Sequence, residues 1–512
     1  MASFDWLAAL DIKQARRNLI FESHGDWHRD PWGWPELNYL IDKGFANIVD
    51  FCRSEVINEI ALLDVPKESW GTRPAVVLAP VDRLAYQALT DSLSLDIAGD
   101  LSVNAYGWRL PAKEPKKGHY SHNNRQWDLY LGNLMSHAVA HPVALRTDIV
   151  SCFASMSINV VQAELDERTP SNFISKRLLS LLGSFDRFRD RSGLPQRSIA
   201  SALIANMIMM TLDDVLEHYS SASPILQGET AQYHSFARWM DDMWLFVDDP
   251  GKARRAQIEL QKAAESVGLY LNAAKTEVLE EGQAVSEVQS IEHSAVDGAL
   301  NRPLNPDAGP LHELIDSILD APEKTGRTSI KFAALRMTAH DENYRALELA
   351  EAAKRMPHAA DALAPLFKEV FTAESLEEWF LDYVRSDWAG FEWTIAQYVR
   401  MFGKDFTPSD ELIEYLADLV ENPATSLPLL AAAAQRLSEW RPATAKTVIR
   451  AASRVTTNAH AVRVLSLAAL NAGEPRRTVR PWITAHDANR AIAELLSERS
   501  FRALPVSETF RG

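Results

Sequence analysis

The sequence predicts two domains of different fold class, an α+β domain over residues 1–305 and an all-α domain over residues 306–512. With 512 residues, the chain is longer than one hydrophobic core usually organises. Up to about residue 305, short apolar runs typical of strands alternate with amphipathic, helix-like segments. Beyond that point the pattern is helix after helix, rich in Ala, Leu and Glu and broken by short polar stretches. This spacing is typical of helix pairs stacked as a HEAT-like helical repeat, although no strict repeat motif accompanies it.

The expected elements of the first domain follow its apolar runs in order. Strands are predicted at 74–78, 143–149, 234–239, 243–247, 269–271 and 277–279. Helices are predicted at 82–95, 158–165, 175–182, 198–218 and 254–267. The polar segment 110–126 is predicted to be an exposed loop.

Composition narrows the class of protein. Hydrophobic residues make up 46% and charged residues 24%, which is ordinary for a soluble globular protein. The two cysteines, Cys52 and Cys152, exclude a disulfide scaffold and a cysteine zinc site, and they fit a reducing compartment. The N-terminus has no signal-peptide pattern, and the longest apolar runs fall short of the ~20 residues that a bilayer requires. We therefore expect a cytoplasmic protein with no membrane partner.

The formal net charge of −16 bears on nucleic-acid binding. Phosphate contacts depend on Lys and Arg, so this charge argues against a protein that coats nucleic acid over its whole surface. It leaves room for an enzyme with a local basic channel.

Three Asp-Asp pairs lie in the second half of the first domain, and their surroundings differ. Asp213-Asp214 lies in a helical pattern, where a solvated or locally paired face is expected. Asp248-Asp249 precedes Pro-Gly and is predicted to be a turn. Asp241-Asp242 lies between two apolar arms, each long enough to be a strand. An acidic pair at a hairpin between buried strands is costly unless a cation offsets it, although a turn that is polar by chance remains the alternative.

A third carboxylate strengthens the interpretation that a cation binds the Asp241-Asp242 pair. The run Ala144-Leu-Arg-Thr-Asp-Ile149 places Asp148 at the end of a buried strand. Three carboxylates at the ends of neighbouring strands are what a two-metal phosphoryl-transfer site requires. Hard oxygen ligands of this kind select magnesium.

Five segments, taken in order, resemble the conserved motifs of reverse transcriptases. They are Arg73-Pro74 with the fingers segment Pro80–Leu89, motif A at Thr147–Met156, motif B at Ser192–Gln196 with Ser201, Ala205 and Asn206, motif C at Arg238–Asp242, and motif D at Gly268–Asn272 with Lys275-Thr276. The resemblance covers about residues 70–280 and implies a fingers region and a palm.

The resemblance also implies roles for individual residues. Catalysis and Mg²⁺ binding would fall to Asp148, Asp241 and Asp242. In the nucleotide site, Phe153 would exclude the 2′-hydroxyl, Gln196 would shape the pocket, Arg73 would contact the triphosphate, and Lys275 would protonate the pyrophosphate. A core aromatic at Phe153 and ordinary surface cations at Arg73 and Lys275 are the alternatives.

Two positions depart from the family pattern. Arg197 stands where the family usually has glycine after Pro-Gln, and Trp239 replaces the usual tyrosine of motif C. A large cation at position 197 is expected to reshape the template–nucleotide pocket, which puts ordinary templated copying in question.

A polymerase domain followed directly by a helical array resembles the bacterial abortive-infection and defence-associated reverse transcriptases of the unknown group. That resemblance implies antiphage defence through DNA synthesis from dNTPs, in some members without a conventional template and primed from a protein tyrosine. The implied partners are dNTPs, the DNA product and an RNA template or non-coding RNA, with homo-oligomerisation open. A retron-like or mobile-element enzyme that copies RNA is one alternative, and an inactive polymerase relic acting as a scaffold is the other.

Overall fold

The computed structural model describes residues 10–23, 25–43, 59–186, 193–223, 233–292, 294–301, 307–499, 501 and 503–504. The chain forms two compact units and passes between them more than once. The first unit contains residues 1–25, 52–57 and 82–294, and the second contains 26–51, 58–81 and 295–512. The last crossing lies near the boundary expected at 305. The segments 26–51 and 58–81, expected in the first domain, instead group with the C-terminal helices.

A five-stranded sheet organises the first unit, in the order β3-β7-β8-β4-β9. Its strands are β3 (Ala105–Tyr106), β4 (Val143–Thr147), β7 (Phe236–Trp239), β8 (Asp242–Val247) and β9 (Glu277–Glu280). Neighbouring strands are antiparallel except for the short parallel pair β3–β7. A separate two-stranded ribbon consists of β5 (Ala222–Ser223) and β6 (Tyr233–His234).

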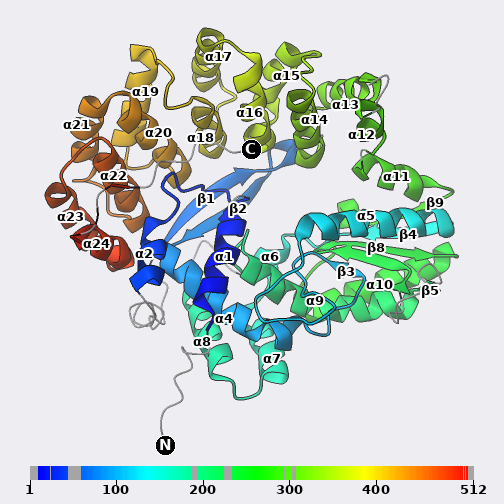
Figure 1. The fold of residues 1–512 in the computed structure, drawn as a ribbon. Helices are drawn as coiled ribbons and strands as arrows, with labels where there is room; N and C mark the ends of the chain where they lie inside the picture. The colour runs from blue at the N-terminus through cyan, green and yellow to red at the C-terminus, as the bar shows by residue number, and fades with distance from the viewer. Residues whose placement is uncertain are drawn as a thin grey trace, which may run out of the picture. The chain divides into compact units, whose positions relative to one another are not determined.

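Helices cover both faces of this sheet (Figure 1). On one face lie α5 (Asn123–Ala140) and α11 (Gln283–Glu292), and on the other lie α9 (Ile199–Tyr219) and α10 (Pro250–Ser266). By length and composition, α9 could cross a membrane, but 78% of its most apolar window is buried, as in the core helix of a globular domain. The unit is completed by α1 (Ile12–Ser23), α4 (Pro80–Ala98), α6 (Cys152–Ser155), α7 (Ile158–Arg168) and α8 (Phe173–Phe185).

The second unit combines a β-hairpin with an array of helices. The hairpin pairs β1 (Ile60–Pro66) with β2 (Thr72–Leu78) in antiparallel register across η2 (Glu68–Trp70). Leu63 and Val65 of β1 are buried in one core with the helices, and β1 packs on α18 and α20. Packing against these helices explains why the hairpin groups with them.

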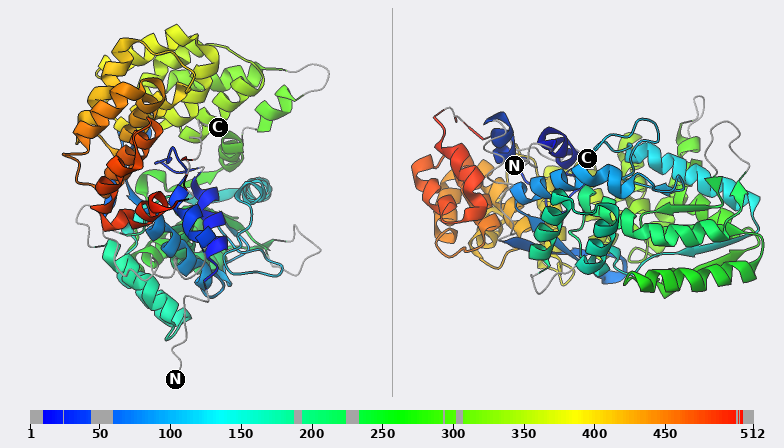
Figure 2. Two further views of the ribbon diagram at one scale, coloured as in Figure 1. Left: turned by 60° about the vertical axis from the view of Figure 1, so that its left-hand side comes forward. Right: turned by 90° about the horizontal axis from the view of Figure 1, so that it is seen from below.

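The helices of this unit follow one another round a curve (Figure 2). They are α2 (Pro35–Lys43), α12 (Ser294–Leu300), α13 (Gly309–Asp320), α14 (Arg327–Ala339), α15 (Ala346–Ala352), α16 (Ala360–Val370), α17 (Ala373–Arg385), α18 (Glu392–Met401), α19 (Asp410–Glu421), α20 (Leu427–Trp440), α21 (Pro442–Ala452), α22 (Ala459–Asn471), α23 (Arg476–Thr484) and α24 (Arg490–Ser497), joined by η4 (Ala353–Arg355), η5 (Pro357–Ala359) and η6 (Asp487–Asn489). The alternate helices α14, α16, α18, α20 and α22 each pack on the next. The chain is therefore mostly helical with a small sheet, and its HEAT-like character stays a prediction.

Candidate active site

The three predicted carboxylates lie at one end of the central strands of the sheet. Asp148 directly follows β4, whose last residue, Thr147, pairs with Met243 of β8. Asp242 is the first residue of β8, and Asp241 precedes it in the turn from β7. Because β4 and β8 are neighbouring antiparallel strands, this register brings Asp148 beside Asp242.

The turn between β7 and β8 has only two residues, Met240 and Asp241, since Trp239 pairs with Asp242. Met240 has a φ of 55°, the left-handed value that the first residue of a primed hairpin turn adopts. A side chain other than glycine is strained in this conformation. The acidic pair is therefore held on a tight turn that its surroundings must stabilise.

Strand alternation places Asp242 on the same face of the sheet as α5. Trp244 and Phe246, at alternate positions of β8, are buried in the cluster that includes Tyr130 and Leu134 of α5. Consistently, the Tyr130 hydroxyl donates a hydrogen bond to Asp242 Oδ2 at 3.1 Å.

The electrostatics show an excess of negative charge in the turn. Burial raises the pKa of Asp241 to about 6, and the nearby charges of Asp148 and Asp242 act in the same direction. Burial also raises the pKa of Asp242, although the guanidinium of Arg146 and the hydroxyl of Tyr130 oppose the shift. These carboxylates would be stabilised by a further cation.

Lys275 supplies one positive charge at the edge of the carboxylate cluster. It ends η3 (Ala273–Lys275), and its Nζ donates to Asp148 Oδ2 at 2.5 Å. Burial acts to lower the pKa of Lys275, but the hydrogen bond and charge of Asp148, with the charges of Asp241 and Asp242, raise it overall. The structure thus brings together four of the seven predicted site residues, namely the three carboxylates and Lys275.

The donor set suits a hard divalent cation. Carboxylate oxygens are the ligands that Mg²⁺ prefers, and the raised pKa of Asp241 shows that the site disfavours its own negative charge. Within the described part of the chain, no group of three or more His, Cys, Asp or Glu side chains is close enough to hold a metal ion. The three carboxylates fit Mg²⁺ by the chemistry of their oxygens, and Lys275 lies on one oxygen of Asp148.

Phe153 and the segment before α9 are tied together through the backbone. Leu194 N donates to Phe153 O at 2.8 Å. Gly193 has a φ of 74°, and a Cβ there would lie 2.2 Å from the same carbonyl oxygen. Only glycine allows this close approach, which fixes the segment carrying Gln196 against the half-buried Phe153.

Arg197 follows this segment, and it is exposed with a φ of 57°. The left-handed backbone explains why a glycine fits this position in the family. Whether the arginine alters templating stays a prediction.

Arg73 and the three carboxylates belong to different units. Arg73 lies on β2 opposite Val65, in the second unit. Its charge there acts on Glu68 and His358. The expected fingers segment is thus divided, because β2 belongs to the second unit and residues from Asp82 onward belong to the first.

Several residues around the carboxylates were not predicted as part of a site. Asp213 is buried rather than solvated, and it pairs with the fully buried Arg238 of β7. An arginine within the apolar run of β7 was the available signal, because a buried charge requires a partner. Tyr130 carried no such signal, since its partner Asp242 is 112 positions away.

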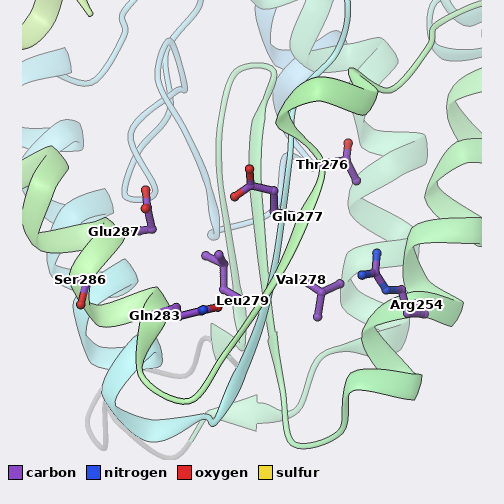
Figure 3. A pocket seen from close by; sticks show the side chains of 8 residues that line it. All are labelled: Arg254, Thr276, Glu277, Val278, Leu279, Gln283, Ser286 and Glu287. Atoms are coloured by element: carbon purple, nitrogen blue, oxygen red, sulfur yellow. The ribbon is translucent and has the colours of Figure 1, made fainter. Parts of the chain in front are cut away.

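An open pocket of about 570 Å³ lies at the outer edge of the sheet, beside β9 (Figure 3). Arg254 of α10, Glu277 of β9 and Glu287 of α11 line it. Thr276, also in its wall, shares a 2.7 Å hydrogen bond with Thr147. Its lining does not include the three carboxylates, so it is separate from the candidate active site.

Two-metal sites, such as those of polymerases, hold their ions on carboxylates, and the acidic hairpin beside Asp148 offers three carboxylates at the ends of neighbouring strands. Residues 65–299 match the family model of reverse transcriptases, described as RNA-dependent DNA polymerases. The chain therefore contains a reverse transcriptase domain, which supports RNA-directed DNA polymerase activity. The match begins in β1 and ends in α12, so it includes parts of both units. No curated protein matches the chain.

Proposed function

We propose that this protein is a DNA polymerase of the reverse transcriptase type that adds dNTPs by a two-metal mechanism. The observation that carries the proposal is the acidic turn beside Asp148, where burial and neighbouring charge raise the pKa of Asp241 to about 6. A protein that used this turn only for structure would gain stability from a neutral residue at the same position.

Asp148, Asp241 and Asp242 would hold Mg²⁺ in this site. The bound ions would activate the attacking 3′-hydroxyl and neutralise charge on the leaving pyrophosphate. Lys275, whose Nζ donates a hydrogen bond to Asp148, would protonate the pyrophosphate. Phe153 would limit space at the sugar, and Gln196 would form part of the pocket beside it. The role of Arg73 rests on the family resemblance alone.

The biological setting that we propose is antiphage defence in the bacterial cytoplasm. The support is the order of parts, a reverse transcriptase domain followed by an array of helices. We further propose that synthesis is untemplated or protein-primed. The support is Arg197, a cation that stands beside Gln196 where the family usually has glycine.

The test is nucleotide incorporation by the purified full-length chain. Labelled dNTPs and Mg²⁺ are supplied with no template, with an RNA template and primer, or with RNA co-purified from the host. Product in the first reaction, with a sequence unrelated to any added RNA, supports untemplated synthesis. Product only with RNA identifies a retron-like or mobile-element enzyme, and no product in any reaction would refute polymerase activity.

Phage plating on cells that express the chain tests the setting separately. Protection that is lost in the Asp241→Ala, Asp242→Ala double variant supports defence by synthesis. Equal protection by the double variant would point to a scaffold.

A further inference from the structure

Arg238 is buried at the base of the acidic turn, with no exposed surface. Its Nε and Nη2 donate to the two oxygens of Asp213 at 2.6 and 2.7 Å. Its Nη1 donates to Asn206 Oδ1 at 2.9 Å and to the Met240 carbonyl oxygen at 3.0 Å. One side chain thus joins α9 to the first residue of the turn.

Asn206 and Asp213 lie seven positions apart on α9, so two turns of the helix present them on the same side. Asn206 is also buried, and its Nδ2 donates to the Gly107 carbonyl oxygen at 3.0 Å. Gly107 has a φ of 81°, and a Cβ there would lie 3.6 Å from the ring of Trp239. The network therefore holds the turn from α9 and from the segment after β3.

A buried ion pair of this kind contributes little net stability, because its desolvation cost offsets its Coulomb energy. The planar guanidinium of Arg238, however, restricts the positions of its hydrogen-bond partners more than an apolar contact would. The hydrogen bond to Met240 falls on the residue with the strained φ of 55°. A strained backbone conformation of this kind persists only where contacts with the surrounding structure hold it in place.

We propose that Arg238, held by Asp213 and Asn206, is a positioning residue that sets the Mg²⁺ affinity of Asp241 and Asp242 by fixing the turn. This inference rests on the proposed function. Because α9 begins just after Gln196, the same helix connects the nucleotide pocket segment to the metal-binding turn.

The experiment measures Mg²⁺ binding by calorimetry and the Mg²⁺ dependence of dNTP incorporation in the full-length chain. Arg238→Lys keeps the charge but loses the fork, and Asn206→Ala removes one acceptor while leaving the ion pair. Both variants are expected to weaken Mg²⁺ binding about 10-fold or more and to lower kcat, with the KM for dNTP changed less. If Arg238→Lys fails to fold, Asn206→Ala carries the test.

Arg463→Lys is the matched control. Arg463 is also buried, and it forms a similar fork with Glu36 at 2.6 and 2.9 Å in the second unit. This variant should lose thermal stability while its Mg²⁺ dependence stays unchanged.

The outcomes separate the two proposals. Wild-type protein that binds no Mg²⁺ and incorporates no nucleotide would refute the proposed function and this inference together. An active wild type with variants that bind Mg²⁺ as tightly would refute the inference alone.

Discussion

Buried acidic side chains are offset differently at the acidic turn of the first unit and at Arg463 of the second unit. In the second unit, Glu36 and Asp30 both accept from Arg463, so a cation of the chain itself offsets them. In the first unit, the acidic turn retains excess negative charge, and the pKa of Asp241 rises to about 6. Lys275 lies at Asp148, but it does not prevent this rise.

This difference separates acidic side chains that are neutralised by an arginine of the chain from acidic side chains that could bind a cation. Removing an acid from the Arg463 network would leave a buried arginine with one of its two charge partners missing, which is destabilising. Removing an acid from the turn relieves repulsion and burial cost at the expense of metal binding. The stability of the acidic turn and that of the Arg463 network should therefore respond in opposite directions when an acid is removed.

The largest expected effect comes from truncating the chain after residue 305. The cut removes the helices on which the β1–β2 hairpin packs, because Leu63 and Val65 share their core. The shortened chain should aggregate or lose its hairpin rather than behave as a free polymerase domain. Solubility, circular dichroism and limited proteolysis measure the outcome, and a stable, monodisperse product would contradict the division into units.

Substitutions at two adjacent residues of β1 test separately whether the hairpin depends on packing against these helices. Leu63 is 3% exposed and Leu62 is 39% exposed, since successive side chains alternate across the strand. Leu63→Asp should lower the melting temperature strongly, and Leu62→Asp should change it little.

The next largest effect is expected for the Asp241→Ala, Asp242→Ala double variant. Loss of the carboxylates should reduce nucleotide incorporation about 10³-fold or more, because charge stabilisation in the transition state is lost. The measurement is single-turnover dNTP incorporation. Asp248→Ala with Asp249→Ala is the control, since this exposed pair lies beyond the sheet, where Asp248 contacts His141 and Asp249 caps α10. Substantial synthesis by the first variant would refute the metal site.

Phe153→Ala tests the predicted sugar selection. A smaller side chain should raise ribonucleotide incorporation relative to deoxyribonucleotide by about 10- to 100-fold, the range that steric rejection of one hydroxyl supplies. Competition between labelled ATP and dATP measures the ratio. Phe173→Ala, at a phenylalanine that is 70% exposed on α8, should leave the ratio unchanged. An unchanged ratio in both variants would make Phe153 a core aromatic.

The sequence predicts best where local pattern decides. Apolar runs next to acids were sufficient to predict the strands beside the carboxylates, and the structure places Asp148 just after β4 and Asp242 at the start of the neighbouring β8. The 74–78 strand was also predicted, but its partner and its unit were not. Those depend on packing between β1 and helices more than 300 residues later.

The partners of buried charges could not be predicted from local pattern either. A helical pattern alone suggested that Asp213-Asp214 was solvated or locally paired. Asp214 is exposed, but the prediction was wrong for Asp213, which is buried and pairs with Arg238 of β7. The left-handed backbone at Met240 could not be predicted either, since methionine has no preference for it. Only the three-dimensional network of Arg238 explains how the chain holds that conformation.

Asp241→Asn should stabilise the metal-free protein. The pKa of Asp241 rises from 3.8 to about 6 on folding, so its contribution favours folding at low pH and is lost as pH rises through this interval. Wild-type melting temperature without Mg²⁺ should therefore fall more between pH 4 and pH 6.5 than that of the variant. At pH 7.5, added Mg²⁺ should stabilise the wild type and not the variant. Parallel pH profiles would contradict the shift.

The smallest effect is expected for Tyr130→Phe, which removes only the hydroxyl that donates to Asp242 Oδ2. The ring stays packed between Tyr106 and Trp239, so the fold should hold. Loss of one hydrogen bond worth about 1 kcal/mol should weaken Mg²⁺ binding and incorporation about 5-fold. Tyr120→Phe makes the same chemical change at Asp91, where the hydroxyl donates at 2.6 Å outside the carboxylate cluster. Similar losses of stability in both variants, with reduced Mg²⁺ binding only in Tyr130→Phe, would show that this hydrogen bond orients the metal-binding carboxylate. Equal Mg²⁺ binding in both would show that it serves packing alone.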